Sequence, residues 1–113
     1  MSYTTITVEK NVADKVGIIT LNRPDVRNAI NPAMTEELGQ AFEALDDDPE
    51  IRAVILTGGP KVFAAGGDIA VMVEKKVLEQ FYRKMLTDLT FKMEKMAKPI
   101  IAAIAGFALG GGC

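Results

Sequence analysis

The sequence predicts an α/β fold in which parallel strands are joined by helical crossovers. Three short apolar runs have the length and composition of buried strands, and they are Val16–Leu21, Val54–Thr57 and Ile100–Ala105. The segments between them are too long for hairpins and carry helical patterns. Parallel strands with right-handed connections account for this order, so we interpret the three runs as equivalent strands of one repeating unit.

The first elements are predicted from alternation and from capping signals. Alternation of apolar and polar residues over Thr4–Val8 predicts a half-buried strand, paired with Val16–Leu21 as an antiparallel hairpin. Asn31 and Pro32 are typical of a helix start. An apolar stripe follows over Met34–Leu45, and the helix is expected to end in the acidic run before Pro49.

A second, longer helix is predicted over Val73–Lys98, where Pro99 ends it. Its apolar positions recur at three- and four-residue spacing, and they are Val77, Leu78, Phe81, Tyr82, Met85, Leu89, Met93 and Met96. Methionines in such a stripe either line a binding groove or pack into the core, and we favour the core. The run Asp46–Asp48 is either a metal site or a solvated loop, and we favour the loop.

Composition excludes several classes of protein. With 113 residues, 49% of them hydrophobic and 25% charged, the chain is at most one globular domain. It has no histidine and Ser2 is its single serine, so Ser–His–Asp and Cys–His catalysis and zinc sites built on Cys and His are excluded. A net charge of −2 gives no support for nucleic-acid binding. No apolar run has the length of a transmembrane helix, so we expect a cytoplasmic protein without a membrane partner.

Two glycine-rich loops follow predicted strands. Within Ala53–Ala70, a strand is followed by the turn Gly58-Gly59-Pro60, an apolar loop over Val62–Ala65, and a glycine pair before Asp68, a good helix N-cap. A second loop of this kind lies within Ile100–Cys113. Neither matches the dinucleotide or P-loop pattern.

The two loops leave two interpretations open. The backbone N–H groups of Gly67 and Gly111 either stabilise an oxyanion, such as the one that forms on a thioester carbonyl, or the glycines relieve crowding at tight turns. Three consecutive glycines with no residues after Cys113 to form a helix suggest the first part of a longer protein.

Several motifs occur in the order of one known family. The sequences LNRP, FAAGGDI and GFALGGGC lie within the blocks Val16–Pro24, Phe63–Ile69 and Lys98–Cys113, accompanied by Asn28-Ala29 and Val54–Gly59. Together they resemble the crotonase superfamily, the enoyl-CoA hydratase/isomerase proteins. The resemblance implies a crotonase-like spiral of repeated ββα units. Residues 1–113 would be the incomplete N-terminal part of a single domain, truncated before the later units and the C-terminal trimerisation helices.

The resemblance also implies an acyl-CoA thioester as ligand, with no cofactor besides the coenzyme A of the substrate. It assigns the oxyanion-hole N–H groups to Gly67 and Gly111. The residues expected to border the coenzyme A adenine and the thioester arm are Ala65, Gly67, Asp68 and Ile69, and those expected to touch the coenzyme A are Val26 and Arg27. Lys61 either meets a coenzyme A phosphate or is an ordinary exposed loop lysine.

The reaction that the resemblance implies is the reversible syn hydration of a 2-enoyl-CoA. In such enzymes two glutamates position water and transfer the proton. The first would follow Cys113 directly, so the chain as given lacks both, and we expect it alone to be inactive and to expose apolar surface. Cys113 would pack under the loop. Two alternatives remain, another crotonase reaction (isomerase, specialised dehydratase or decarboxylase) and a non-catalytic coenzyme A-binding or interaction fragment. The full protein is expected to be a homotrimer or hexamer.

Overall fold

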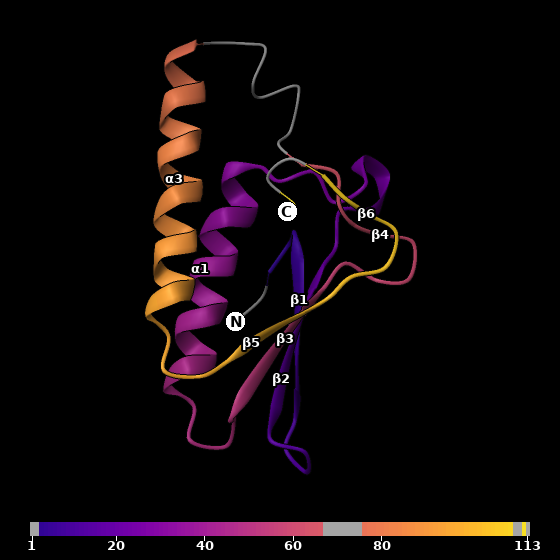
Figure 1. The fold of residues 1–113 in the computed structure, drawn as a ribbon, viewed down its shortest axis with the longest axis vertical. Coiled ribbons are helices and arrows are strands. Elements are labelled where there is room, and N and C mark those ends of the chain that lie inside the picture. Colours follow the sequence, from indigo (N-terminus) through magenta and orange to yellow (C-terminus); the bar gives the residue numbers. More distant parts are fainter. Residues whose placement is uncertain (1–2, 67–75, 110–111, 113) are drawn as a thin grey trace.

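The computed structural model describes residues 3–66, 76–109 and 112. Within these, the elements are β1 Ile6–Asn11, β2 Val16–Leu21, the 3-10 helix η1 Pro24–Val26, α1 Pro32–Asp47, β3 Ala53–Thr57, β4 Val62–Ala64, α3 Lys76–Lys95, β5 Ile100–Ala103 and β6 Phe107–Ala108. Figure 1 shows the two long helices lying alongside each other, on one side of the strands.

The main sheet has four strands in the order β1-β2-β3-β5. The hairpin is antiparallel and pairs Ile6 with Leu21, whereas β2, β3 and β5 run parallel to one another. This confirms the predicted hairpin and the prediction that three equivalent parallel strands follow one another through long connections. Their carboxyl ends therefore lie at one edge of the sheet.

The core lies between this sheet and α1. The buried side chains of α1 include Met34, Leu38, Phe42 and Leu45, which is the apolar stripe expected from the sequence. The helix begins as predicted, because the Asn31 side chain accepts a hydrogen bond of 2.8 Å from the backbone N–H of Met34.

The second helix ends earlier than predicted, at Lys95 instead of Lys98. Leu89 is buried, and Met93 and Met96 pack against the core, as expected for core methionines. The side chains of Val77, Leu78, Phe81, Tyr82 and Met85 lie outside the described part of the structure. In that part, neither long helix combines the length and apolarity needed to cross a membrane.

The acidic run joins the ends of the two helices. The Asp46 carboxylate accepts the backbone N–H groups of Ala97 and Lys98 at 3.2 and 3.3 Å. The Lys98 ammonium donates to two carbonyls at the end of α1, both at 2.6 Å. Asp48 pairs with Lys10 at 2.6 Å. Part of the run, expected to be a solvated loop, therefore has structural partners.

Two predicted segments differ from the structure. The run Ile100–Ala105 forms only the four-residue β5 and is not buried, with Ile101 54% and Ile104 55% exposed. The reason is that β5 is the last strand of the sheet within the described residues, and of its side chains only Ile100 packs against the core described there. The segment Val62–Ala65, predicted as a loop, contains β4, which pairs in parallel with β6. This pairing joins residues more than forty positions apart, so local sequence does not reveal it.

Candidate functional site

The turn after β2 has an unusual backbone. Pro24 opens the single turn η1, and the next two residues, Arg27 and Asn28, have positive φ angles of 52° and 57°. Asparagine tolerates this left-handed conformation better than most residues do. The Asn28 side chain is only 2% exposed, so its amide must find its partners inside the protein.

Asn28 joins this turn to the loop between β3 and β4. Its Oδ1 accepts the backbone N–H of Arg23 at 2.8 Å. Its Nδ2 donates to the carbonyls of Gly58 at 3.0 Å and Phe63 at 3.1 Å, with a longer contact of 3.4 Å to that of Val62. The side chain thus bridges the two ends of the β3–β4 loop.

Two backbone hydrogen bonds extend this connection toward the first glycine pair. The N–H of Ala65 donates to the carbonyl of Arg27 at 3.1 Å, and the N–H of Ile30 donates to the carbonyl of Gly66 at 2.7 Å. The turn after β2 and the segment that leads into Gly67 are therefore fixed to each other.

A cavity of about 590 Å³ lies between the two connected segments. Its lining includes two cationic side chains, Arg27 and Lys61, together with Asn28 and the glycine–proline turn at Gly58–Pro60. Both cations are exposed. Among the described residues, no carboxylate forms an ion pair with either. The cavity is therefore suited to an anion in contact with solvent.

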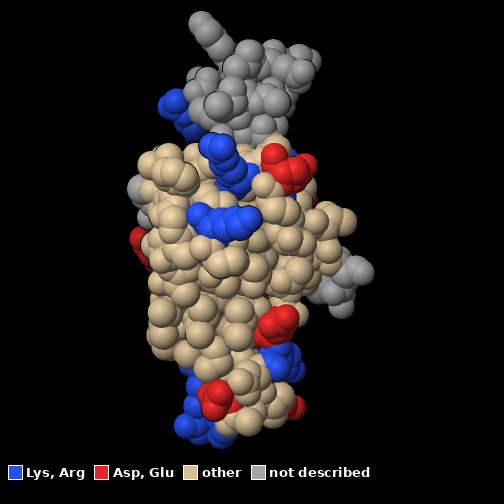
Figure 2. Space-filling model, turned by 90° about the vertical axis from the view of Figure 1, so that its right-hand side faces the viewer, with Lys and Arg blue, Asp and Glu red and all other residues tan. Residues whose placement is uncertain are grey.

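The face that contains β4 and β6 has its charges toward its two ends. Figure 2 shows Lys and Arg side chains in the upper part of this face, a broad uncharged surface across its middle, and charges of both signs at its lower end. Phe107 in β6 is 58% exposed, and Leu109, directly after β6, is 54% exposed. This confirms the expected exposed apolar surface.

The two glycine-rich segments meet at β4 and β6. Beyond that pairing, the N–H of Leu109 donates to the carbonyl of Ala64 at 3.1 Å. A Cβ on Gly112 would collide with the Ala64 carbonyl oxygen and lie 3.0 Å from the Ala64 Cβ. Glycine at position 112 is therefore required by close packing, which agrees with the crowding interpretation at this position.

The predicted site residues are distributed as follows. Arg27 and Lys61 line the same cavity, and Ala65 is held by the Arg27 carbonyl. Val26 lies in η1, 38% exposed, and does not line the cavity. Four predicted residues, Gly67, Asp68, Ile69 and Gly111, lie outside the described residues, as does Cys113. The described residues on either side of Gly111 lie next to the segment that precedes Gly67.

The sequence patterns do not assign Asn28 to the site. They place it in a block that resembles the family and give it no role. The sequence does contain a signal for the unusual backbone at Asn28. The residue follows shortly after an Asn-Arg-Pro turn that ends a strand, and asparagine in such a turn is a candidate for left-handed backbone. Its partners at positions 58 and 63 are not visible in local sequence.

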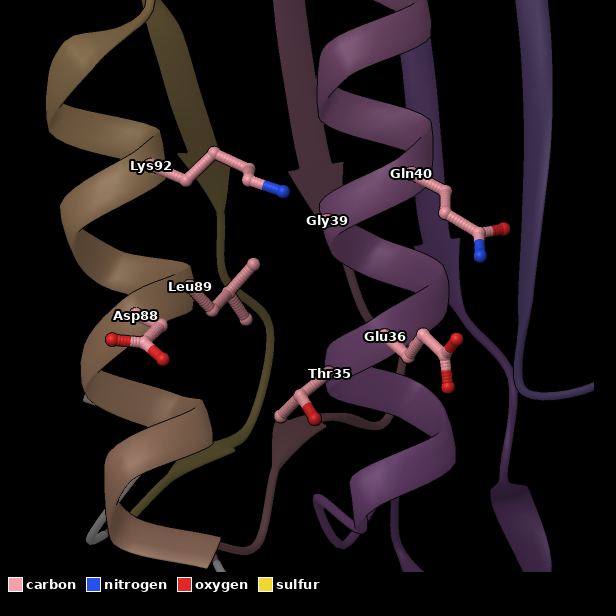
Figure 3. A pocket seen from close by; sticks show the side chains of 7 residues that line it. All are labelled: Thr35, Glu36, Gly39, Gln40, Asp88, Leu89 and Lys92. Atoms are coloured by element: carbon pink, nitrogen blue, oxygen red, sulfur yellow. The ribbon is translucent and has the colours of Figure 1, made fainter. Parts of the chain in front are cut away.

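An apolar cavity and a groove lie beside the two long helices. An apolar cavity of about 190 Å³ lies among α1, α3 and the strands, and its lining includes Phe63, Ala64 and Gly112. A groove of about 250 Å³ separates α1 and α3. In Figure 3 its Lys92 side chain points toward α1, where the ammonium pairs with Glu43 at 2.7 Å. Figure 3 shows the Glu36 and Gln40 side chains pointing away from α3, so the polar side chains of the groove do not converge, and it is not the candidate site.

The shifted titratable groups belong to the scaffold. Burial raises the pKa of Glu37, but hydrogen bonds from Thr5 and Thr4 outweigh burial and hold that pKa below its ordinary value. A hydrogen bond to Asp48 raises the pKa of Lys10, and the same bond lowers the pKa of Asp48. These groups do not line the cavity that contains Arg27 and Lys61.

The sequence and the fold both match one family of proteins. The family model described as enoyl-CoA hydratase/isomerase matches residues 11–113. The chain therefore belongs to the enoyl-CoA hydratase/isomerase family, and the crotonase-like fold expected from its motifs is confirmed.

Individual relatives agree with this assignment. The chain is 46% identical over 113 residues to a probable enoyl-CoA hydratase of Mycobacterium tuberculosis, covering 100% of this chain and 43% of that protein. It is 42% identical to a crotonyl-CoA hydratase of Syntrophomonas wolfei, over 100% of this chain and 44% of the relative. The crystal structure of an enoyl-CoA hydratase/isomerase from Xanthobacter autotrophicus superposes with a TM-score of 0.90 at 30% identity, over 99% of this chain and 42% of the other. The chain thus spans less than half the length of these relatives.

Proposed function

We propose that the complete protein containing this chain is an enoyl-CoA hydratase. It adds water reversibly and syn across the double bond of a 2-enoyl-CoA, with the water oxygen bonding to C3 and a proton to C2. The observation that carries the proposal is the contact of Ala64 with Leu109 and with Gly112, through the 3.1 Å hydrogen bond to Leu109 and the packing of Gly112. The proposed oxyanion donors, Gly67 and Gly111, adjoin these residues in sequence.

The two backbone N–H groups would act on the thioester carbonyl. Attack of water at C3 builds enolate charge on that oxygen, and donors placed in advance stabilise it at no cost of reorganisation. Removing one such donor typically costs about 10²–10³-fold in rate. We propose that the acid–base groups are two glutamates, of which the first follows Cys113 directly. The 113-residue chain alone is accordingly expected to be inactive.

The cavity beside Asn28 is proposed to hold the phosphates of coenzyme A. Arg27 and Lys61 line it and supply positive charge on an open, solvated wall. Further proposed contacts are those of Val26, Ala65, Asp68 and Ile69 with the adenine and the thioester arm. The 190 Å³ apolar cavity, which borders both Ala64 and Gly112, would take the acyl chain. Coenzyme A enters as part of the substrate, and no further cofactor is proposed.

The exposed apolar side chains are proposed to be covered in the complete protein. Four of them, Ile101, Ile104, Phe107 and Leu109, lie in or directly after β5 and β6 and are each more than half exposed. A group of exposed apolar side chains of this kind is typical of a packing site. Later ββα units of one domain would cover it, within a homotrimer or hexamer located in the cytoplasm.

The test is turnover of crotonyl-CoA by the complete natural gene product. We expect loss of the ultraviolet absorbance of the conjugated enoyl thioester, and a product heavier by one water in mass spectrometry. Migration of the double bond without a change in mass would show that the enzyme is an isomerase and not a hydratase. Binding of coenzyme A without any turnover would instead show that the protein is a non-catalytic binding module.

A further inference from the structure

The β3–β4 loop carries Lys61 on a short turn that one buried side chain closes. The turn runs through Gly58, Gly59 and Pro60, and Gly59 has a φ of 93°. Asn28 donates to the carbonyl of Gly58 before Lys61 and to that of Phe63 after it, at 3.0 and 3.1 Å. The shape of the loop therefore depends on a residue of the neighbouring turn.

The same residue is covalently next to the second cation. Arg27 directly precedes Asn28, and its carbonyl accepts the N–H of Ala65 at 3.1 Å. The Asn28 Oδ1 also accepts the N–H of Arg23 at 2.8 Å, so both ends of its own turn are held as well. One amide thus connects the backbone beside Arg27 to the backbone on both sides of Lys61.

From this geometry, and resting on the proposed function, we propose that Asn28 is a positioning residue of the coenzyme A site. It fixes the loop of Lys61 against the turn of Arg27, so that both cations face one anionic ligand in the 590 Å³ cavity. Asn28 does not touch the ligand in this proposal. It acts through Lys61.

Asparagine is the side chain that these partners require. The N–H of Arg23 needs an acceptor and the two carbonyls need a donor, and a neutral amide supplies both. Asn28→Asp keeps the shape and the acceptor but sets a carboxylate oxygen against the carbonyls of Gly58 and Phe63. Asn28→Gly keeps the left-handed backbone and removes all the side-chain bonds. The two variants therefore separate the donor from the backbone conformation.

The experiment measures coenzyme A affinity by calorimetry, and KM and kcat with crotonyl-CoA, in the complete gene product. We expect N28D and N28G each to weaken coenzyme A binding and to raise KM by about tenfold, which corresponds to about 1.4 kcal/mol. The value of kcat should change by less than about twofold, because the backbone hydrogen bonds Ala65–Arg27 and Ile30–Gly66 still hold the segment that leads into Gly67.

A double-mutant cycle with Lys61→Ala distinguishes positioning from general support of the fold. If Asn28 acts through Lys61, N28G should weaken coenzyme A binding by less than about threefold in the K61A background. The control is Glu37→Ala, which removes hydrogen bonds to Thr4 and Thr5 remote from the cavity. It should lower stability and leave affinity unchanged.

Each alternative outcome has its own meaning. Unchanged affinity in N28D and N28G, or equal losses in the wild-type and K61A backgrounds, would overturn the role of Asn28. An affinity loss in E37A as large as that in N28G would reduce the effect to destabilisation. A wild-type protein that does not bind coenzyme A overturns the proposed function itself. If neither Asn28 variant folds, amide hydrogen exchange of the wild-type protein decides, since the backbone amides of Gly59, Lys61 and Val62 must then be protected as strongly as those of β3.

Discussion

Gly112→Ala would separate the two glycine segments that we propose form the oxyanion hole. A Cβ at this position would lie 3.0 Å from the Cβ of Ala64, 3.1 Å from its carbonyl carbon and closer still to its carbonyl oxygen. Ordinary contacts of a Cβ lie at 3.4–4 Å. Two of the three obstructing atoms are backbone, so a side-chain rotation cannot remove the clash. The segments must move apart by roughly an ångström.

That displacement sets the expected size of the effect. A shift of about 1 Å in a catalytic arrangement costs about 10²-fold in rate. We therefore expect kcat with crotonyl-CoA to fall by about 10²-fold in G112A. Coenzyme A affinity should stay within about twofold, because Gly112 does not line the cavity of Arg27 and Lys61. The assay is steady-state hydration of crotonyl-CoA with calorimetric binding of coenzyme A in parallel.

A matched glycine-to-alanine change serves as the control. In Gly39→Ala the nearest atom to the new Cβ is the Lys92 Nζ at 3.4 Å, the mobile end of a long side chain. Alanine is also favoured over glycine within a helix by about 1 kcal/mol. G39A should thus keep full activity and melt at or above the wild-type temperature. A folded G112A enzyme with wild-type kcat would refute the reasoning, since contact between the segments would then be unnecessary.

Three further changes test the cavity and the scaffold. Lys61→Ala should weaken coenzyme A binding by about three- to tenfold at low salt, and by less at high salt because the charge is exposed. The control Lys84→Ala on α3 should have no effect on binding. Equal effects of the two variants would contradict a phosphate contact of Lys61. Glu37→Gln should lower the free energy of unfolding by about 1 kcal/mol at neutral pH. Since the folded-state pKa of Glu37 lies below its ordinary 4.5, this difference should vanish as the pH falls through that pKa, and a pH-independent difference in urea unfolding would be inconsistent with it. Lys98→Ala removes two bonds to carbonyls at the end of α1 and should cost about 1–3 kcal/mol in urea unfolding, whereas an unchanged midpoint would show that these bonds add nothing.

Elements specified by neighbouring residues could be predicted from the sequence. The start of α1 follows from Asn31 and Pro32, and the structure has the Asn31 cap bond at the expected place. The hairpin and the parallel strands follow from apolar runs and from the lengths of the connections. These signals are local, so they do not depend on which distant segments meet.

Features that depend on distant partners were missed. The strand β4 exists because Val62 and Ala64 pair with Phe107 and Ala108, and the second strand of that pair is only two residues long. The role of Asn28 depends on carbonyls thirty or more positions away. The prediction that Ile100–Ala105 is buried is wrong for a related reason. The exposure of a strand depends on what packs against it and not on its own composition alone.

The order of the strands explains where the proposed site lies. In the sheet, β2, β3 and β5 are neighbours and run in the same direction, so the residues that follow them leave at one edge. The turn of Arg27 follows β2, the turn of Lys61 follows β3, and the segment from Gly106 to Gly112 follows β5. A Cβ on Gly106 would collide with the Lys61 carbonyl, so the second and third of these segments are in contact. The cations thus lie between β2 and β3, and the glycine contact lies between β3 and β5. A ligand with anionic groups at one end and a thioester at the other would lie across the carboxyl ends of the strands in that order, as ligands of open parallel sheets commonly do.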